Sequence, residues 1–162
     1  MFACALGWLA YPKASGLDGF PPELRVELSR RLTPEQWTRL QAIAEEHPEV
    51  FAHDDGLTER SRWIHAIAAS LDVYATDCLS LKDYDAAEEA FRISLAVNPG
   101  AEAPDASFDA EYGLILALQQ KGAAAEIGQR ARAALAAHEL FPESGPADKY
   151  MISQLRALAA KK

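Results

Sequence analysis

The sequence predicts an all-α protein, a single domain over residues 1–162 built as an array of about seven helices. Alanine is the commonest residue, whereas the β-branched residues typical of strands are few. Apolar residues recur at spacings of three and four along most of the chain, which is the pattern of a helix with one buried face. Glycine and proline fall between these stretches, where helices begin or end. With 49% hydrophobic residues, the chain has enough apolar surface for one folded core.

Two helices are predicted within residues 1–56, which we expect to form an N-terminal helical cap region. The first is a short helix over 23–32. The second begins after Thr33, because this residue can cap a helix that starts with a proline, and Gln36 can complete the cap. It ends at His47, since the proline that follows cannot continue a helix.

The best-defined helical hairpin is predicted over 58–99. Its first helix runs over 58–81, with apolar residues at every third or fourth position, and its second runs over 84–97. Lys82 and Asp83, between the two helices, interrupt the apolar pattern. We therefore expect the helices to lie antiparallel on either side of these two residues.

A second, more degenerate hairpin is predicted over 105–142. Its helices run over 108–121 and 123–141, and Gly122 lies at the turn between them. The segment 146–162 is predicted to contain one last helix. Because an array of repeated helices needs its exposed end covered, we interpret this helix as a C-terminal cap.

The turn of the first hairpin reads Lys82-Asp83-Tyr84-Asp85-Ala86-Ala87, Phe91 follows in its second helix, and Asn98-Pro99 ends it. In order and spacing these residues resemble the tetratricopeptide repeat, a helix-turn-helix unit of about 34 residues. The resemblance covers residues 71–99, with Lys82 in place of the family's turn glycine. It implies small residues where the two helices approach closely, and Ala75 and Ala87 stand at those positions. Residues 108–141 resemble the same unit more weakly.

Repeats of this family usually bind extended or helical peptides on the face formed by their first helices. The resemblance places six residues on that face: Asp72, Thr76, Leu79, Tyr112, Leu116 and Gln119. None of them is lysine or arginine, which disfavours the family's clamp for a carboxylate terminus and favours an apolar or mildly polar peptide. We therefore expect a non-catalytic interaction module, an adaptor or chaperone, with a protein or peptide partner and no cofactor.

Two other functions stay open. Small acidic chaperones of type III secretion translocators are similar in length, in having few repeats and in a Leu-Gln-Gln-Lys-Gly-like turn, here Leu118 to Gly122. A small all-α enzyme with a carboxylate and histidine site is the other alternative, and it predicts a pocket with convergent ionisable side chains and shifted pKa values.

His47 and the run His53-Asp54-Asp55 match no metal-ligand spacing, so no metal is expected.

Charge and cysteine content limit the partners and the compartment. A net charge of −8 disfavours nucleic acid. Cys4 and Cys78 stand far apart in the sequence, so both are interpreted as free thiols of a cytoplasmic protein.

The apolar start, residues 1–11, is too short to span a bilayer and lacks the basic flank of an export signal. We interpret it as a segment packed on the core, or alternatively as a contact for a partner or a homodimer.

Overall fold

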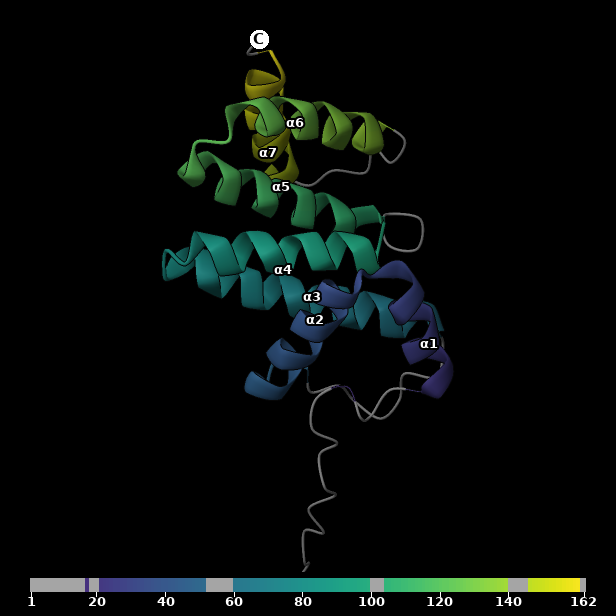
Figure 1. Ribbon diagram of the computed structural model, residues 1–162. Helices are drawn as coiled ribbons and strands as arrows, with labels where there is room; N and C mark the ends of the chain where they lie inside the picture. The colour runs from purple at the N-terminus through teal and green to yellow at the C-terminus, as the bar shows by residue number, and fades with distance from the viewer. Residues whose placement is uncertain (1–16, 18–20, 52–59, 100–103, 140–145, 161–162) are drawn as a thin grey trace, which may run out of the picture.

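The structure, a computed structural model, describes residue 17 and residues 21–51, 60–99, 104–139 and 146–160. This part of the chain is all-helical, with seven helices and no strand (Figure 1). The helices are α1 (Pro22–Arg31), α2 (Pro34–Glu46), α3 (Arg60–Ser80), α4 (Tyr84–Val97), α5 (Pro104–Lys121), α6 (Ala124–Glu139) and α7 (Pro146–Ala159). The predicted fold class is confirmed, and a helix is found at each predicted place.

The start of α5 differs from the prediction. The sequence places it at Phe108, whereas the helix begins at Pro104. Proline is accommodated in the first turn of a helix because its missing N–H has no partner there. Pro104 therefore opens the helix instead of closing the loop before it. The predictions for the apolar segment 1–11 and for Cys4 lie outside the described residues.

The helices pack on one another in the order of the chain. The α3–α4 pair is the most extensive, α4 packs on α5, α5 on α6 and α6 on α7, and α3 also packs directly on α5. Figure 1 shows α3 to α6 stacked in this succession, with α1 and α2 beside the α3–α4 pair. One cluster of buried apolar side chains extends from Leu24 in α1 to Leu155 in α7. The described chain is thus an array of helices with a continuous core.

The α3–α4 and α5–α6 connections have the same geometry. Lys82 (φ 64°) and Gly122 (φ 75°) both adopt the left-handed conformation. The N–H of Asp83 donates to the carbonyl of Cys78 (2.9 Å), and the N–H of Ala123 donates to the carbonyl of Leu118 (3.1 Å). In each turn these bonds satisfy a carbonyl at the end of the helix while the chain reverses direction.

Side-chain caps fix two of the helix starts. Thr33 Oγ1 accepts a hydrogen bond from the Gln36 N–H (3.2 Å), and Gln36 Oε1 accepts one from the Thr33 N–H (3.0 Å), as the sequence predicts. At α4, Asp83 Oδ1 accepts from the Ala86 N–H (3.1 Å). Asp83 therefore helps to end α3 with its backbone and to begin α4 with its side chain, which keeps the connection short.

Small residues lie where the helices pack closely. Ala75 on α3 and Ala87 on α4 have no exposed surface. On α5, a Cβ at Gly113 would lie within 2.8 Å of three ring carbons of Phe91 on α4. The absence of a side chain at 113 therefore lets the aromatic ring of α4 pack against the backbone of α5.

The last helix covers the end of the array. α7 buries Ile152 and Leu155, while Lys149, Gln154 and Arg156 are exposed. This helix is therefore apolar toward α6 and polar toward solvent. None of the helices in the described ranges is both long and apolar enough to cross a membrane.

Candidate functional site

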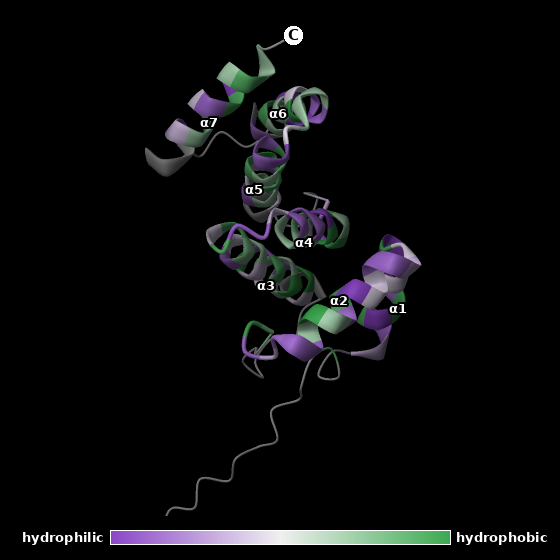
Figure 2. Cartoon of the chain, turned by 60° about the vertical axis from the view of Figure 1, so that its left-hand side comes forward, coloured by the Kyte–Doolittle hydropathy of each residue, from purple (hydrophilic) through white to green (hydrophobic). Residues whose placement is uncertain are grey.

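The sequence-predicted site residues lie on α3 and α5, which pack directly against each other. In Figure 2, α3 and α7 extend toward the same side of the array, away from α4 and α6. We use the term inner face for the partly or fully exposed residues that stand at helical spacings on these two helices, Asp72, Thr76 and Leu79 on α3 and Asp109, Tyr112 and Leu116 on α5. These side chains come from the first helix of each hairpin, as the sequence predicts.

Asp72 is the most perturbed ionisable group of this face. Its side chain is half-buried, and Oδ1 is buried without a hydrogen-bond partner among the described residues. Burial raises the pKa of Asp72 to about 7; the nearby Ser94 hydroxyl on α4 acts to lower it, and the charge of Asp109 on α5 raises it further. Near neutral pH this carboxyl is therefore divided between its neutral and charged forms.

The apolar part of the inner face lies on α5. Tyr112 and Leu116, one helical turn apart, are both half-buried. Burial raises the pKa of Tyr112, and the charge of Tyr150 on α7 raises it further, which places the two phenols near each other. Tyr150 is 64% exposed. An aromatic and apolar strip is thus open to solvent beside the two aspartates.

The remaining predicted residues differ in their surroundings. Thr76 is exposed, and its hydroxyl donates to the carbonyl of Asp72 in its own helix (2.8 Å). Leu79 is half-buried against the core. Gln119 is exposed and lines a cavity of about 1010 Å³ bordered by α6 and the end of α7. Small residues such as Gly128 and Ala159 line this cavity together with Gln119.

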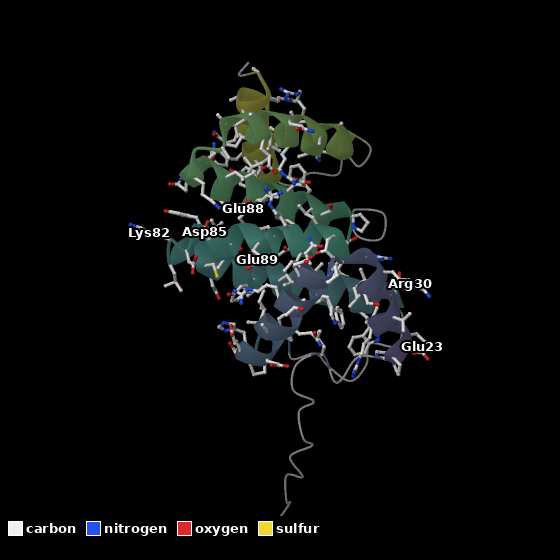
Figure 3. All side chains as sticks on the ribbon, in the orientation of Figure 1. Glu23, Arg30, Lys82, Asp85, Glu88 and Glu89 are labelled. Carbon is white, nitrogen blue, oxygen red and sulfur yellow. The ribbon has the colours of Figure 1, made fainter. Side chains whose placement is uncertain are left out.

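Charged side chains lie along α4 on the side that faces α2 and the end of α5, where Figure 3 labels Asp85, Glu88 and Glu89. They border a cavity of about 530 Å³ that also includes Arg39 and Lys121. Arg39 pairs with Glu89 (2.9 Å), and Lys121 pairs with Glu88 (2.6 Å). Ionisable side chains from α2, α4 and α5 thus converge on this cavity.

The ion pairs continue from α4 to α6 and α5. Arg92 bonds Glu88 (2.9 Å) in its own helix and both carboxylate oxygens of Glu126 on α6 (2.8 and 2.9 Å). Arg130 then joins Glu126 (2.8 Å) to Glu111 on α5 (3.0 Å). The network ties three successive helices together through paired charges.

The pKa shifts in this network favour the charged forms. Burial acts to raise the pKa of Glu88, but hydrogen bonds from Lys121 and Arg92 outweigh it and hold the pKa below its usual value. The pKa of Lys121 is raised by its hydrogen bonds to Asp85 and Glu88. A general acid or base needs the opposite, a pKa moved toward neutrality, so these pairs are suited to holding helices together.

Three histidines have described side chains: His65 on α3 is exposed, and the other two lie beside aromatic rings. His47 lies against the Tyr74 ring (centroids 4.9 Å apart) and within 3.3 Å of Glu49 Oε1. His138 lies 5.3 Å from the Phe108 ring. The rest of the predicted acidic loop, residues 53–55, lies outside the described residues. Cys78, the cysteine that the structure describes, is a buried free thiol, and burial raises its pKa.

Asp109 of the inner face and Tyr150 of α7, which lies near it, are absent from the sequence-based prediction. Asp109 precedes Tyr112 by three residues, and this helical spacing could have placed it on the same face. Tyr150 gave no such signal, because only the packing of α7 brings it near Tyr112.

Comparison with protein-family models, with curated proteins and with solved structures finds no match to the chain.

Proposed function

We propose that the protein is a non-catalytic, tetratricopeptide-like interaction module, an adaptor or chaperone, that binds an extended segment of a partner protein along the inner face. The observation that carries this proposal is the packing of α3 on both α4 and α5. It sets the first helices of two successive hairpins side by side and leaves Tyr112 and Leu116 partly uncovered. An open strip of this kind suits an extended peptide with apolar side chains.

Two further observations support a repeat. The turns at Lys82 and Gly122 share their left-handed residue and their hydrogen bonds. Ala75 and Ala87 are buried where the resemblance requires small residues. Lys82 occupies the place of the family's glycine in the backbone conformation that glycine adopts most easily.

The enzyme alternative has less support. The cavity in which ionisable groups converge is lined by ion pairs whose pKa shifts stabilise the charged forms. Asp72 has a pKa close to neutrality, yet it lies beside an apolar strip and not in that cavity.

The buried free thiol of Cys78 supports a reducing compartment, so we place the proposed module in the cytoplasm.

A display experiment tests this function. The full-length protein is used to select binders from a random dodecapeptide library on phage, alongside the double variant Tyr112→Asp/Leu116→Asp. We expect enriched sequences with the wild type and a loss of their binding to the variant. Because both side chains are half-buried, Thr76→Arg serves as a second variant, since it blocks the inner face from an exposed position.

The matched control removes apolar surface elsewhere. Val26→Asp/Leu81→Asp changes two exposed apolar residues, on α1 and at the α3–α4 turn. We expect this control to bind the selected peptides as well as the wild type. Binding that survives both inner-face changes, with the helical circular dichroism intact, would contradict the proposal.

A further inference from the structure

The cavity of about 1010 Å³ at the end of the array combines an apolar lining with one cation. Ile127 is buried and Leu158 is half-buried in its lining. Among the described residues that line the cavity, Arg132 on α6 is the one charged side chain. Its guanidinium donates to the carbonyl of Ala159 (3.1 Å), and no carboxylate of the described residues forms an ion pair with it. The positive charge at this end of the molecule is therefore available to a partner.

Arg132 lies between two small residues on the surface of α6. Gly128 precedes it and Ala136 follows it by four residues, and residues at this spacing lie one above the other on a helix. We call Gly128, Arg132 and Ala136 the α6 row. Because neither small residue extends beyond Cβ, the row is low on both sides of the guanidinium. Such positions accept large side chains from another helix, as Gly113 accepts the ring of Phe91 within the array.

α3 exposes a row with the opposite pattern. Val73 is 54% exposed and Leu81 is 81% exposed, and Asp77, also exposed, lies four residues from each of them. The N–H of Leu81 donates to the carbonyl of Asp77 (3.0 Å), so the helical spacing continues to Leu81 just beyond the end of α3. No basic side chain of the described chain pairs with Asp77. We call these three residues the α3 ridge, which presents two large apolar side chains with an anion between them.

The α3 ridge and the α6 row match in spacing and in charge. Both advance by about 6 Å for every four residues, since each follows a helix. When Asp77 lies at Arg132, Val73 and Leu81 therefore lie one turn to either side of the ion pair, over the two small residues. Ridges of residues four apart pack into the grooves of a second helix in the commonest class of helix pairs. Both surfaces are exposed within one chain, so they can meet only between two copies.

We propose that two copies of the chain associate, with the α3 ridge of each packed on the α6 row of the other. The α3–α4 and α5–α6 connections lie on the same side of the array, where Asp85 and Lys121 pair (Figure 1), so a two-fold axis forms the same contact twice. By helical spacing, the α3 ridge lies roughly a third of a turn around α3 from Asp72, Thr76 and Leu79. The contact therefore uses a surface outside the inner face and goes beyond the proposed function.

Charge reversal tests the contact in the full-length protein. Sedimentation velocity over a range of concentrations gives the dissociation constant of the dimer for the wild type, Asp77→Arg and Arg132→Asp. Each reversal places like charges opposite each other in both contacts, so we expect the dissociation constant to rise about ten-fold or more. Glu45→Arg on α2 and Arg30→Asp on α1 make the same changes of charge at exposed positions elsewhere. We expect both controls to associate as the wild type does.

A mixture of the two reversed variants tests the pairing of these two residues. In a dimer formed by one copy of Asp77→Arg and one copy of Arg132→Asp, opposite charges face each other again in both contacts. We expect the mixture to form this heterodimer with a dissociation constant near that of the wild-type dimer, although neither variant pairs with itself. Different fluorescent labels on the two variants identify the heterodimer in the same sedimentation experiment.

Three results would overturn the inference: a wild type that stays monomeric, a dimer that tolerates either reversal, and a mixture that does not associate. A dimer held together by the apolar segment 1–11 would give the second result, because charges on α3 and α6 would not affect it. The selection of peptides on the inner face tests the proposed function separately, so either proposal can fail without the other.

Discussion

The substitution Gly113→Ala tests the contact between α4 and α5 on which the array depends. In an ordinary helix, replacing glycine with alanine stabilises the protein by about 1 kcal/mol. At Gly113 the new Cβ would meet the Cζ, Cε1 and Cε2 atoms of Phe91 at 2.8 Å or less. Phe91 is 2% exposed, so the ring has little room to move. Overpacking of this kind costs about 1–3 kcal/mol, and three colliding atoms place it at the upper end.

The net effect is a destabilisation of about 2 kcal/mol, the difference between the cost of the collision and the gain in helix propensity. For a chain of this size it corresponds to a fall in Tm of roughly 4–8 °C. Urea denaturation followed by circular dichroism gives the free energy of unfolding directly.

A double-mutant cycle identifies the cause. Phe91→Leu removes all three ring atoms that the new Cβ would meet, so Gly113→Ala in that background should stabilise the protein by up to about 1 kcal/mol. The predicted change of sign amounts to a coupling energy of about 3 kcal/mol. If Gly113→Ala stabilises the wild type, or the coupling is below about 0.5 kcal/mol, α5 does not pack on α4 as described.

Three further predictions concern the turns, the inner face and the ion pairs. Lys82→Gly should stabilise the protein by about 0.5–1 kcal/mol, and Gly122→Ala should destabilise it by about 1–2 kcal/mol, because both positions are left-handed. Lys82→Ala, which removes the rest of the side chain but keeps the Cβ, should bring no such gain in urea denaturation. The raised pKa of Asp72, about 7, means that the folded state holds its proton longer than the unfolded state, so this group's contribution to stability is greatest below about pH 4 and is lost as the pH rises through 7. Asp72→Asn should therefore leave the free energy of unfolding nearly unchanged at pH 4 and raise it by on the order of 2–4 kcal/mol at pH 8. The raised pKa of Asp72 would be contradicted if the difference between variant and wild type were the same at both pH values, or if the exposed control Asp77→Asn gave the same change. Arg92→Met should lower the free energy of unfolding by about 1 kcal/mol. Because the arginine is partly exposed, 1 M NaCl should remove most of the difference between variant and wild type. A difference that is the same with and without salt would show that packing, not charge, is responsible.

The helices could be predicted from the sequence because their signals are local. A periodic apolar face, a cap such as Thr33 and a break such as Gly122 are each contained within a few residues. The start of α5 was misplaced because a proline fits both a loop and a first helical turn. The pairing of α3 with α4 was predictable for the same reason, since a short turn leaves few arrangements for two helices.

The details of the candidate site depend on packing between distant residues. The contact of Gly113 with Phe91 and the nearness of Tyr150 to Tyr112 join helices that no local pattern connects. The approach of Asp109 to Asp72 follows from α3 packing directly on α5. Spacing alone could place each residue on a helix face, but it could not tell which faces meet.

Site-specific photocrosslinking tests the central claim, that a partner segment binds on the inner face. A benzophenone amino acid is placed at Thr76 on α3 or at Glu89 on α4, two exposed positions on different sides of the array. Each protein is irradiated with the biotin-labelled peptide enriched by display. The account predicts a crosslinked product from position 76 and none from position 89; crosslinking from position 89 alone, or equally from both, would contradict it.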